Sequence, residues 1–273
     1  MKIAIQLRQL LEIAGISDVL LIGHEQSFVY DGQWQRVANP FRSKQKLREQ
    51  ILEMVIQSGE RWDIAKPYVD FSFGNYRFHA VMGEAIANED QLSIRIHKPI
   101  EDQPLDPKLR LIAESQDSFL ISGVTGSGKT TLLSKMLRAN QQRTVLVEQT
   151  PEIELDPPSV TLHSRRANIE GAGEVEVTEL LNQALRMRPD RIAVGEVRGK
   201  EILALLVAIN NGHKGAAATV HAPSVGLVKD RLVTLGLLAG VGKEIVLELA
   251  KSLDWIIHIE NTEVEGIYRW ADL

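Results

Sequence analysis

The chain has 273 residues, no cysteine, a net charge of −5 and the composition of an ordinary core-forming protein, with 44% hydrophobic and 25% charged residues. The lack of cysteine excludes a disulfide framework, a tetracysteine zinc site, an iron–sulfur cluster and thiol catalysis. The acidic balance argues against a protein whose main task is to coat nucleic acid. Its apolar runs, such as Ile202–Ile209, are far shorter than the roughly 20 residues that cross a bilayer. We therefore expect a soluble protein of the cytoplasm.

A proline-rich stretch, residues 97–108, separates two segments of different character. Pro99, Pro104 and Pro107 lie there among charged residues, which suits an extended linker. Basic and acidic residues balance at 12 each over residues 1–98, so the net charge of −5 belongs to the remainder. We expect an N-terminal domain over residues 1–98, a linker over 99–108 and a second domain over 109–273.

The first segment predicts a small α+β domain. Apolar residues at helical spacing run from Ile3 to Ala14, with Gly15 as a suitable end, and Ser43 can cap a second helix through Gln57. Alternating apolar residues predict strands at 19–22, 27–30, 33–37, 68–73, 76–82 and 92–97. We expect these strands to form an antiparallel meander.

The second segment alternates strand, loop and helix, which predicts an α/β domain with a parallel sheet flanked by helices. The expected strands are 118–122, 144–147, 191–194, 216–220 and 255–259. The expected helices are 129–139, 178–187, 200–210, 225–238 and 243–252.

A phosphate-binding loop follows the first of these strands. Residues 123–130 read Gly-Val-Thr-Gly-Ser-Gly-Lys-Thr, which matches G-x-x-x-x-G-K-[ST] between an apolar strand and a helix. Glycines allow backbone N–H groups to turn toward phosphates, and the helix N-terminus adds partial positive charge. Lys129 can reach the β- and γ-phosphates, and the Thr130 hydroxyl can bind Mg²⁺. The predicted nucleotide-binding residues are Gly123, Val124, Thr125, Gly126, Ser127, Gly128, Lys129, Thr130 and Thr131.

Two acidic residues at strand ends are candidates for binding the metal and activating the attacking water. Glu196 follows the strand 191–194, and Glu148 ends the strand 144–147, with Glu152 and Glu154 behind it. One carboxylate can order the metal while another takes a proton from water. Either glutamate could order the metal, and either could take the proton. The alternative for each is a solvated surface acid without a catalytic role.

Histidines and arginines supply further candidates. His213 and His221 lie near a helix end and a strand end, where ligands of parallel sheets bind, whereas His163 and the other four histidines are expected to be structural. Five arginines are expected near the nucleotide: Arg165, Arg166, Arg188, Arg191 and Arg198. Surface ion pairing is the alternative for every arginine.

Four segments occur in order: GVTGSGKTT, VLVEQTPEIEL, LRMRPDRIAVGEVRG and NNGHKGAAATVHAPS. Together they resemble the Walker A, Asp box, Walker B and His box of the type II/type IV secretion ATPases. SRRANIEGAGEVEVTELLNQ and the upstream GISDVLLIG and LSIRIHKP are most similar to the tight-adherence (Tad, CpaF-like) pilus branch.

The resemblance implies a RecA-like P-loop ATPase domain with a mainly parallel sheet behind a smaller, PAS-like α+β domain, and a homohexameric ring with ATP and Mg²⁺. It implies catalytic roles for Lys129, Glu148, Glu196 and His221, and nucleotide contact for His213. The metal would be bound by Thr130 and, through water, by Glu196. Three arginines, Arg165, Arg77 and Arg95, match family arginines, the last two being ones that approach the nucleotide.

Two positions depart from the family pattern. The Asp box usually reads Glu-Asp, but Gln149 follows Glu148 here, which leaves proton abstraction resting more on Glu148. Thr125 replaces a usual proline.

We expect an ATPase that powers a Tad-like pilus or a type II/IV secretion machine, docked peripherally on inner-membrane partners and without direct nucleic-acid binding. A conjugative or DNA-export motor is one alternative. An ATP-dependent scaffold with weak hydrolysis is another.

Overall fold

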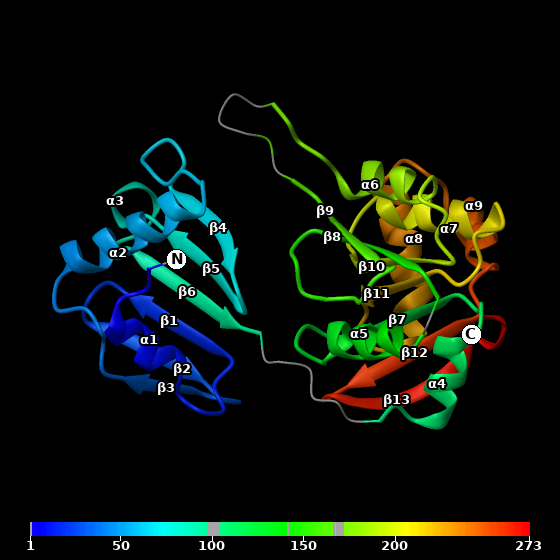
Figure 1. Ribbon diagram of the computed structural model, residues 1–273, viewed down its shortest axis with the longest axis horizontal. Coiled ribbons are helices and arrows are strands. Elements are labelled where there is room, and N and C mark those ends of the chain that lie inside the picture. The colour runs from blue at the N-terminus through cyan, green and yellow to red at the C-terminus, as the bar shows by residue number, and fades with distance from the viewer. Residues whose placement is uncertain (1, 98–103, 141, 166, 168–171) are drawn as a thin grey trace. The chain divides into compact units, whose positions relative to one another are not determined.

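The computed structural model describes residues 2–97, 104–140, 142–165, 167 and 172–273. The chain divides into two compact units, Met1–Pro99 and Ile100–Leu273 (Figure 1). Helix α4 (Pro107–Glu114) begins inside the stretch expected to be linker. It does so because the Asp106 carboxylate accepts a hydrogen bond from the Lys108 amide at 2.8 Å, and proline suits the first helical position.

The first unit contains a six-stranded antiparallel sheet in the order β3-β2-β1-β6-β5-β4. Its strands are β1 (Asp18–Ile22), β2 (Gln26–Tyr30), β3 (Trp34–Val37), β4 (Tyr68–Phe73), β5 (Tyr76–Val81) and β6 (Gln91–Ile96). The expected single meander is wrong, because β3 and β4 lie at opposite edges and the helix between them carries the chain across. Pairing of β6 with β1 joins the two halves.

Helices pack on one face of this sheet. They are α1 (Ile5–Leu11), α2 (Lys44–Gln57) and the short α3 (Gly83–Ile86). Leu7 and Leu47 from the helices are fully buried in one core with Phe78 from β5. Residues alternate along β5 and β6, so Arg77, His79 and Arg95 lie on the other face.

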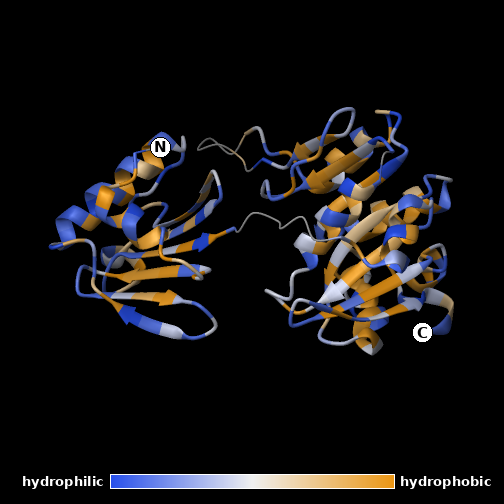
Figure 2. Ribbon diagram, turned by 60° about the horizontal axis from the view of Figure 1, so that its bottom comes forward, coloured by the Kyte–Doolittle hydropathy of each residue, from blue (hydrophilic) through white to orange (hydrophobic). Residues whose placement is uncertain are grey.

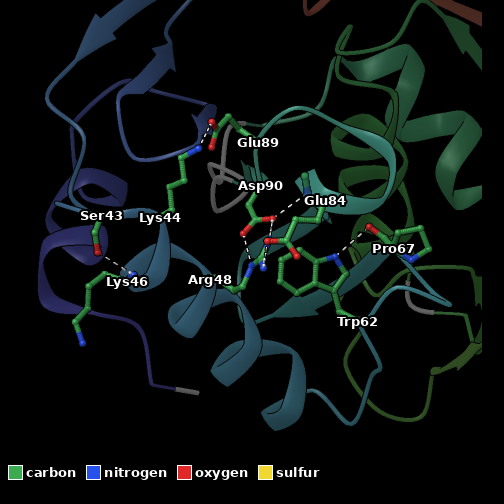
Figure 3. Close-up of polar contacts among 10 residues, drawn as sticks. Ser43, Lys44, Lys46, Arg48, Trp62, Pro67, Glu84, Glu89 and Asp90 are labelled. Atoms are coloured by element: carbon green, nitrogen blue, oxygen red, sulfur yellow. Dashed lines mark hydrogen bonds and ion pairs between the residues drawn. The ribbon is translucent and has the colours of Figure 1, made fainter.

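A buried carboxylate fixes α2 to the turn before β6 (Figure 3). Asp90, 6% exposed, accepts two hydrogen bonds of 2.8 Å from Arg48 and one of 2.9 Å from the Gly83 amide. Burial by itself would raise the pKa of Asp90, but these hydrogen bonds outweigh it and hold that pKa below its ordinary value. Lys44 and Glu89 form a second ion pair nearby, at 2.5 Å.

The second unit is built on a seven-stranded sheet in the order β13-β12-β7-β11-β10-β8-β9. Its strands are β7 (Phe119–Gly123), β8 (Thr144–Glu148), β9 (Val160–His163), β10 (Arg191–Val197), β11 (Ala217–His221), β12 (Trp255–Glu260) and β13 (Glu263–Arg269). All neighbours are parallel except β12 and β13. The edge strands β9 and β13 were not predicted, because neither has the fully buried apolar pattern of the central strands.

Helices cover both faces of this sheet and enclose two cores. The helices are α4, α5 (Lys129–Ala139), α6 (Val177–Ala184), α7 (Glu201–Asn210), α8 (Val228–Leu238) and α9 (Lys243–Ala250), with 3₁₀ turns at Val225–Leu227 and Trp270–Asp272. Alternate strand residues face the two sides: Leu120 lies in the core of α6–α9, and Ile121 in the core of α4 and α5. Figure 2 shows the resulting concentration of hydrophobic residues on the strands. Within the described residues, none of the helices has the length and apolarity needed to span a membrane.

Candidate active site

The phosphate loop lies between β7 and α5, as the sequence predicts. Gly126 and Gly128 have φ values of 79° and 90°, a left-handed conformation that glycine adopts readily. A methyl group at Gly123 would come within 2.4 Å of the Ile259 carbonyl oxygen, so only glycine fits there. These glycines let the backbone turn tightly into the first turn of α5, where N–H groups can bind phosphate.

Lys129 and Ser127 point their polar atoms into this loop. The Lys129 ammonium donates a 2.7 Å hydrogen bond to the Val124 carbonyl. Burial lowers the pKa of Lys129, Glu196 opposes that effect, and Arg198 adds to it. The Ser127 hydroxyl is buried and has no hydrogen-bond partner among the described residues. A buried cation and an unpaired hydroxyl within one loop fit an oxyanion ligand.

The carboxyl ends of four neighbouring parallel strands, β7, β11, β10 and β8, bring the phosphate loop and the other candidates to the same edge of the sheet. The β11–β7 register pairs His221 with Gly123, and the His221 Nδ1 lies 3.5 Å from the Thr125 hydroxyl. Glu148 ends β8, which pairs with β10, the strand that contains Glu196. The sheet order therefore places His221, Glu196 and Glu148 successively farther from the loop.

Glu148 is a buried acid, with only 4% of the residue exposed. Its Oε2 accepts weak hydrogen bonds from the amides of Glu152 (3.3 Å) and Ile153 (3.4 Å). Burial raises the pKa of Glu148 to about 7, since desolvation outweighs the two amides. Gly195 makes room for this side chain: a methyl group there would lie 3.0 Å from the Glu148 Cγ. A carboxyl group with a pKa near 7 is well suited to accept a proton from water.

Glu196 is half-buried and paired with Arg198, one of the arginines expected near the nucleotide. The Arg198 Nε donates a 2.7 Å hydrogen bond to its Oε2. The hydroxyl of Thr130, at the start of α5, and the carboxylate of Glu196 are both oxygen donors of the kind that Mg²⁺ prefers. The residues therefore fit this ion, with Arg198 as a competing partner for the carboxylate.

The remaining predicted residues of this unit occupy different positions. His213 follows α7 and precedes β11, so it lies at the amino edge of the sheet, opposite the phosphate loop; its amide donates to the Ala208 carbonyl. The prediction that His213 contacts nucleotide is not supported by its place in this unit. Thr131 is exposed on α5. Arg165 follows β9, and its Nε donates a 2.7 Å hydrogen bond to the Gly173 carbonyl. Arg166, also expected near the nucleotide, lies outside the described residues.

Arg191 was wrongly expected near the nucleotide, because it begins β10 at the amino edge of the sheet. It is 1% exposed, its Nη2 donates to the carbonyls of Ala113 (3.2 Å) and Ser115 (2.7 Å), and it stacks on the Phe119 ring. Burial lowers its pKa to about 10. Arg191 thus caps the C-terminal end of α4.

Arg77 and Arg95 face each other across β5 and β6 of the first unit. The Arg95 Nε donates a 2.9 Å hydrogen bond to Asp18 on β1. Their predicted approach to nucleotide remains a prediction.

A phosphate loop at the carboxyl edge of a mainly parallel sheet, with helices on both faces, defines a RecA-like P-loop ATPase domain, here preceded by an α+β domain. Residues 87–262 match the family model described as Type II/IV secretion system protein. The chain belongs to this family of secretion ATPases.

Individual relatives agree with this assignment. The chain is 38% identical to a Mycobacterium tuberculosis protein named "Putative conjugal transfer protein", over 98% of this chain and 82% of the relative. Its fold is similar to the VirB11 ATPase of the Brucella suis type IV secretion system, crystallised with sulphate (22% identity, 97% and 95% of the two chains, TM-score 0.52). It is also similar to the pilus retraction motor PilT with bound ADP (21% identity, 94% and 78%, TM-score 0.61).

Proposed function

We propose that this chain hydrolyses ATP to ADP and phosphate as a subunit of a hexameric motor, and that the motor powers assembly of a Tad-like pilus or a related secretion machine at the inner membrane. The observation that carries the proposal is the shared edge of the sheet, where the phosphate loop, Glu196 and the buried Glu148 all lie. The family supports the reaction class, and the Tad-like segments of the sequence support the machine.

Each residue has a distinct task in this proposal. Loop amides and Lys129 bind the β- and γ-phosphates and stabilise the charge that develops on them. Mg²⁺, held by Thr130 and through water by Glu196, would neutralise phosphate charge. Glu148 orients the attacking water and takes its proton.

The remaining candidates act around the γ-phosphate. His221 adjoins Thr125 of the loop, so its position can respond to whether the γ-phosphate is bound. Arg165, Arg77 and Arg95 supply positive charge to a nucleotide, in the ring from a neighbouring subunit. Hydrolysis then changes the relation between the two units, and the ring transmits this change to membrane partners.

Steady-state hydrolysis in Lys129→Ala and Glu196→Gln tests the reaction. We expect Lys129→Ala to lose nucleotide binding, because it removes the cation of the loop. Glu196→Gln keeps binding and loses about 100-fold or more in turnover, the scale at which one electrostatic or acid–base group acts. Exposed Glu263→Gln on β13 is the matched control and keeps the wild-type rate. Intact hydrolysis in either of the first two variants would contradict the assignment.

A second candidate is a motor for conjugative DNA export, which the name of the Mycobacterium tuberculosis relative favours. The net charge of −5 argues against direct tracking along DNA, since such binding depends on neutralising phosphates with basic residues. Turnover measured with DNA and, separately, with the membrane partners distinguishes the two. Stimulation by DNA with steep salt dependence supports DNA export, whereas stimulation by membrane partners alone supports the pilus or secretion motor.

A scaffold that binds ATP but barely hydrolyses it is a third candidate, favoured by Gln149 in place of the usual Asp-box acid. Normal ATP binding with flat turnover in the presence of the membrane partners would support the scaffold.

A further inference from the structure

His163 lies beside the buried carboxyl group of Glu148. The two residues are register partners on the neighbouring strands β9 and β8. The His163 Nε2 is 3.8 Å from the Glu148 Oε2. Nothing in the sequence distinguished this histidine from the structural ones, because β9 itself was not predicted.

A buried base needs a route by which its proton can leave. The side chain of Glu148 is 3% exposed, whereas that of His163 is 40% exposed. The other groups at the Glu148 carboxyl cannot serve, because the Glu152 and Ile153 amides are donors and Gly195 has no side chain. Within the part of the chain that the structure describes, His163 is the ionisable side chain in contact with this carboxyl group.

Burial changes the proton affinities of the two side chains in opposite directions. Burial raises the pKa of Glu148 to about 7, helped by the negative charge of the exposed Glu152, and burial lowers the pKa of His163 from its ordinary value. The proton therefore resides mainly on Glu148, and its release from His163 to solvent draws the transfer forward. The 3.8 Å separation exceeds a hydrogen bond, so transfer requires a small side-chain rotation or one bridging water.

We propose that His163 is the proton relay of Glu148, an inference that rests on the proposed ATP hydrolysis. In each turnover the oxygen of water bonds to the γ-phosphorus, the bond from that phosphorus to the bridging oxygen breaks, and Glu148 receives the water proton. Glu148 passes the proton to Nε2 of His163. The imidazolium releases the proton on Nδ1 to solvent. Exchange with water then moves the remaining proton from Nε2 to Nδ1, which returns His163 to its starting tautomer and restores both side chains for the next turnover.

Single-turnover hydrolysis of His163→Ala and His163→Gln, with and without added imidazole, tests this relay. We expect both variants to slow hydrolysis by about 10-fold or more, while nucleotide affinity changes by less than about 2-fold. Imidazole restores the hydrolysis rate of His163→Ala in proportion to the concentration of neutral imidazole, because the shortened side chain leaves a solvent-open space beside Glu148. His163→Gln stays slow with imidazole, because the longer side chain occupies that space.

Three comparisons make the result decisive. His24→Ala, a histidine of the β1–β2 turn, keeps the wild-type rate and shows no imidazole dependence. A wild-type rate in His163→Ala, or a slow rate that imidazole does not raise, would overturn the relay and leave the proposed function standing. If Glu148→Gln hydrolysed ATP at the wild-type rate, Glu148 would not be the base. That part of the proposed function and the relay would then fail together.

Discussion

Replacing Glu148 with glutamine should stabilise the folded protein while it slows hydrolysis by at least about 100-fold. Burial holds the pKa of this carboxyl group at about 7, above its ordinary value of 4.5. The folded state therefore binds the proton more tightly than the unfolded state. The stability that protonated Glu148 contributes is present below about pH 4.5 and is lost as the pH rises through 7. Glutamine is neutral at every pH, and its carbonyl oxygen can still accept from the Glu152 and Ile153 amides.

The difference between the two pKa values sets the size of the effect. At about 1.4 kcal/mol per pH unit, it amounts to about 3 kcal/mol above pH 7. In a domain of this size that free energy shifts a urea midpoint by about 1 M. At about pH 5 the gain falls below about 1 kcal/mol, because Glu148 is then mostly protonated in the folded state.

Urea denaturation at about pH 5 and about pH 8.5, followed by circular dichroism, measures both values. Exposed Glu263→Gln serves as the control and should shift neither midpoint. An equal gain for Glu148→Gln at both pH values would refute the reasoning, as would a loss of stability at about pH 8.5.

Three further predictions concern residues around the site and in the two cores. Gly195→Ala should slow single-turnover hydrolysis by about 10-fold at unchanged ATP affinity, because its methyl group would lie 3.0 Å from the Glu148 Cγ and displace the carboxyl group. Gly226→Ala is the control and should be neutral, because a methyl group there meets no described atom within 4 Å. Equal rates for the two variants would contradict the steric explanation. Arg191→Met should lower the free energy of unfolding by about 3 kcal/mol by leaving buried carbonyls at the end of α4 unpaired, and an unchanged urea midpoint would argue against the cap. Asp90→Asn should destabilise the first unit by about 2 kcal/mol at neutral pH, with the difference shrinking below about pH 4, since the pKa of Asp90 is lowered in the folded state; a pH-independent difference in urea denaturation would rule out the charge as its cause.

The phosphate loop and the central strands could be predicted from sequence because each has a strong local signal. The glycines and Lys129 occur at fixed spacing, and β7 and β8 are buried at every position, so their apolar runs are unbroken. Parallel strands then place their carboxyl ends at one edge, which is why Glu148 and His221 could be assigned to the same site in advance.

The missed features depend on contacts between segments that are distant in the sequence. The role of Arg191 depends on the carbonyls at the end of α4, some 76 residues earlier in the chain. The order of the first sheet depends on β1 pairing with β6 instead of with a neighbour in the chain. His163 belongs to a four-residue edge strand without an apolar run, so its position beside Glu148 follows only from the β8–β9 register.

The central claim is that a buried glutamate at the edge of a RecA-like sheet activates water for ATP hydrolysis. The most direct test is a single-turnover measurement of phosphate release from ATP and Mg²⁺, comparing the wild-type chain with Glu148→Gln. Both proteins should bind ATP with similar affinity, and the variant should release phosphate at least about 100-fold more slowly. Equal rates of phosphate release, or a wild-type chain that binds ATP and releases no phosphate even with its membrane partners present, would contradict it.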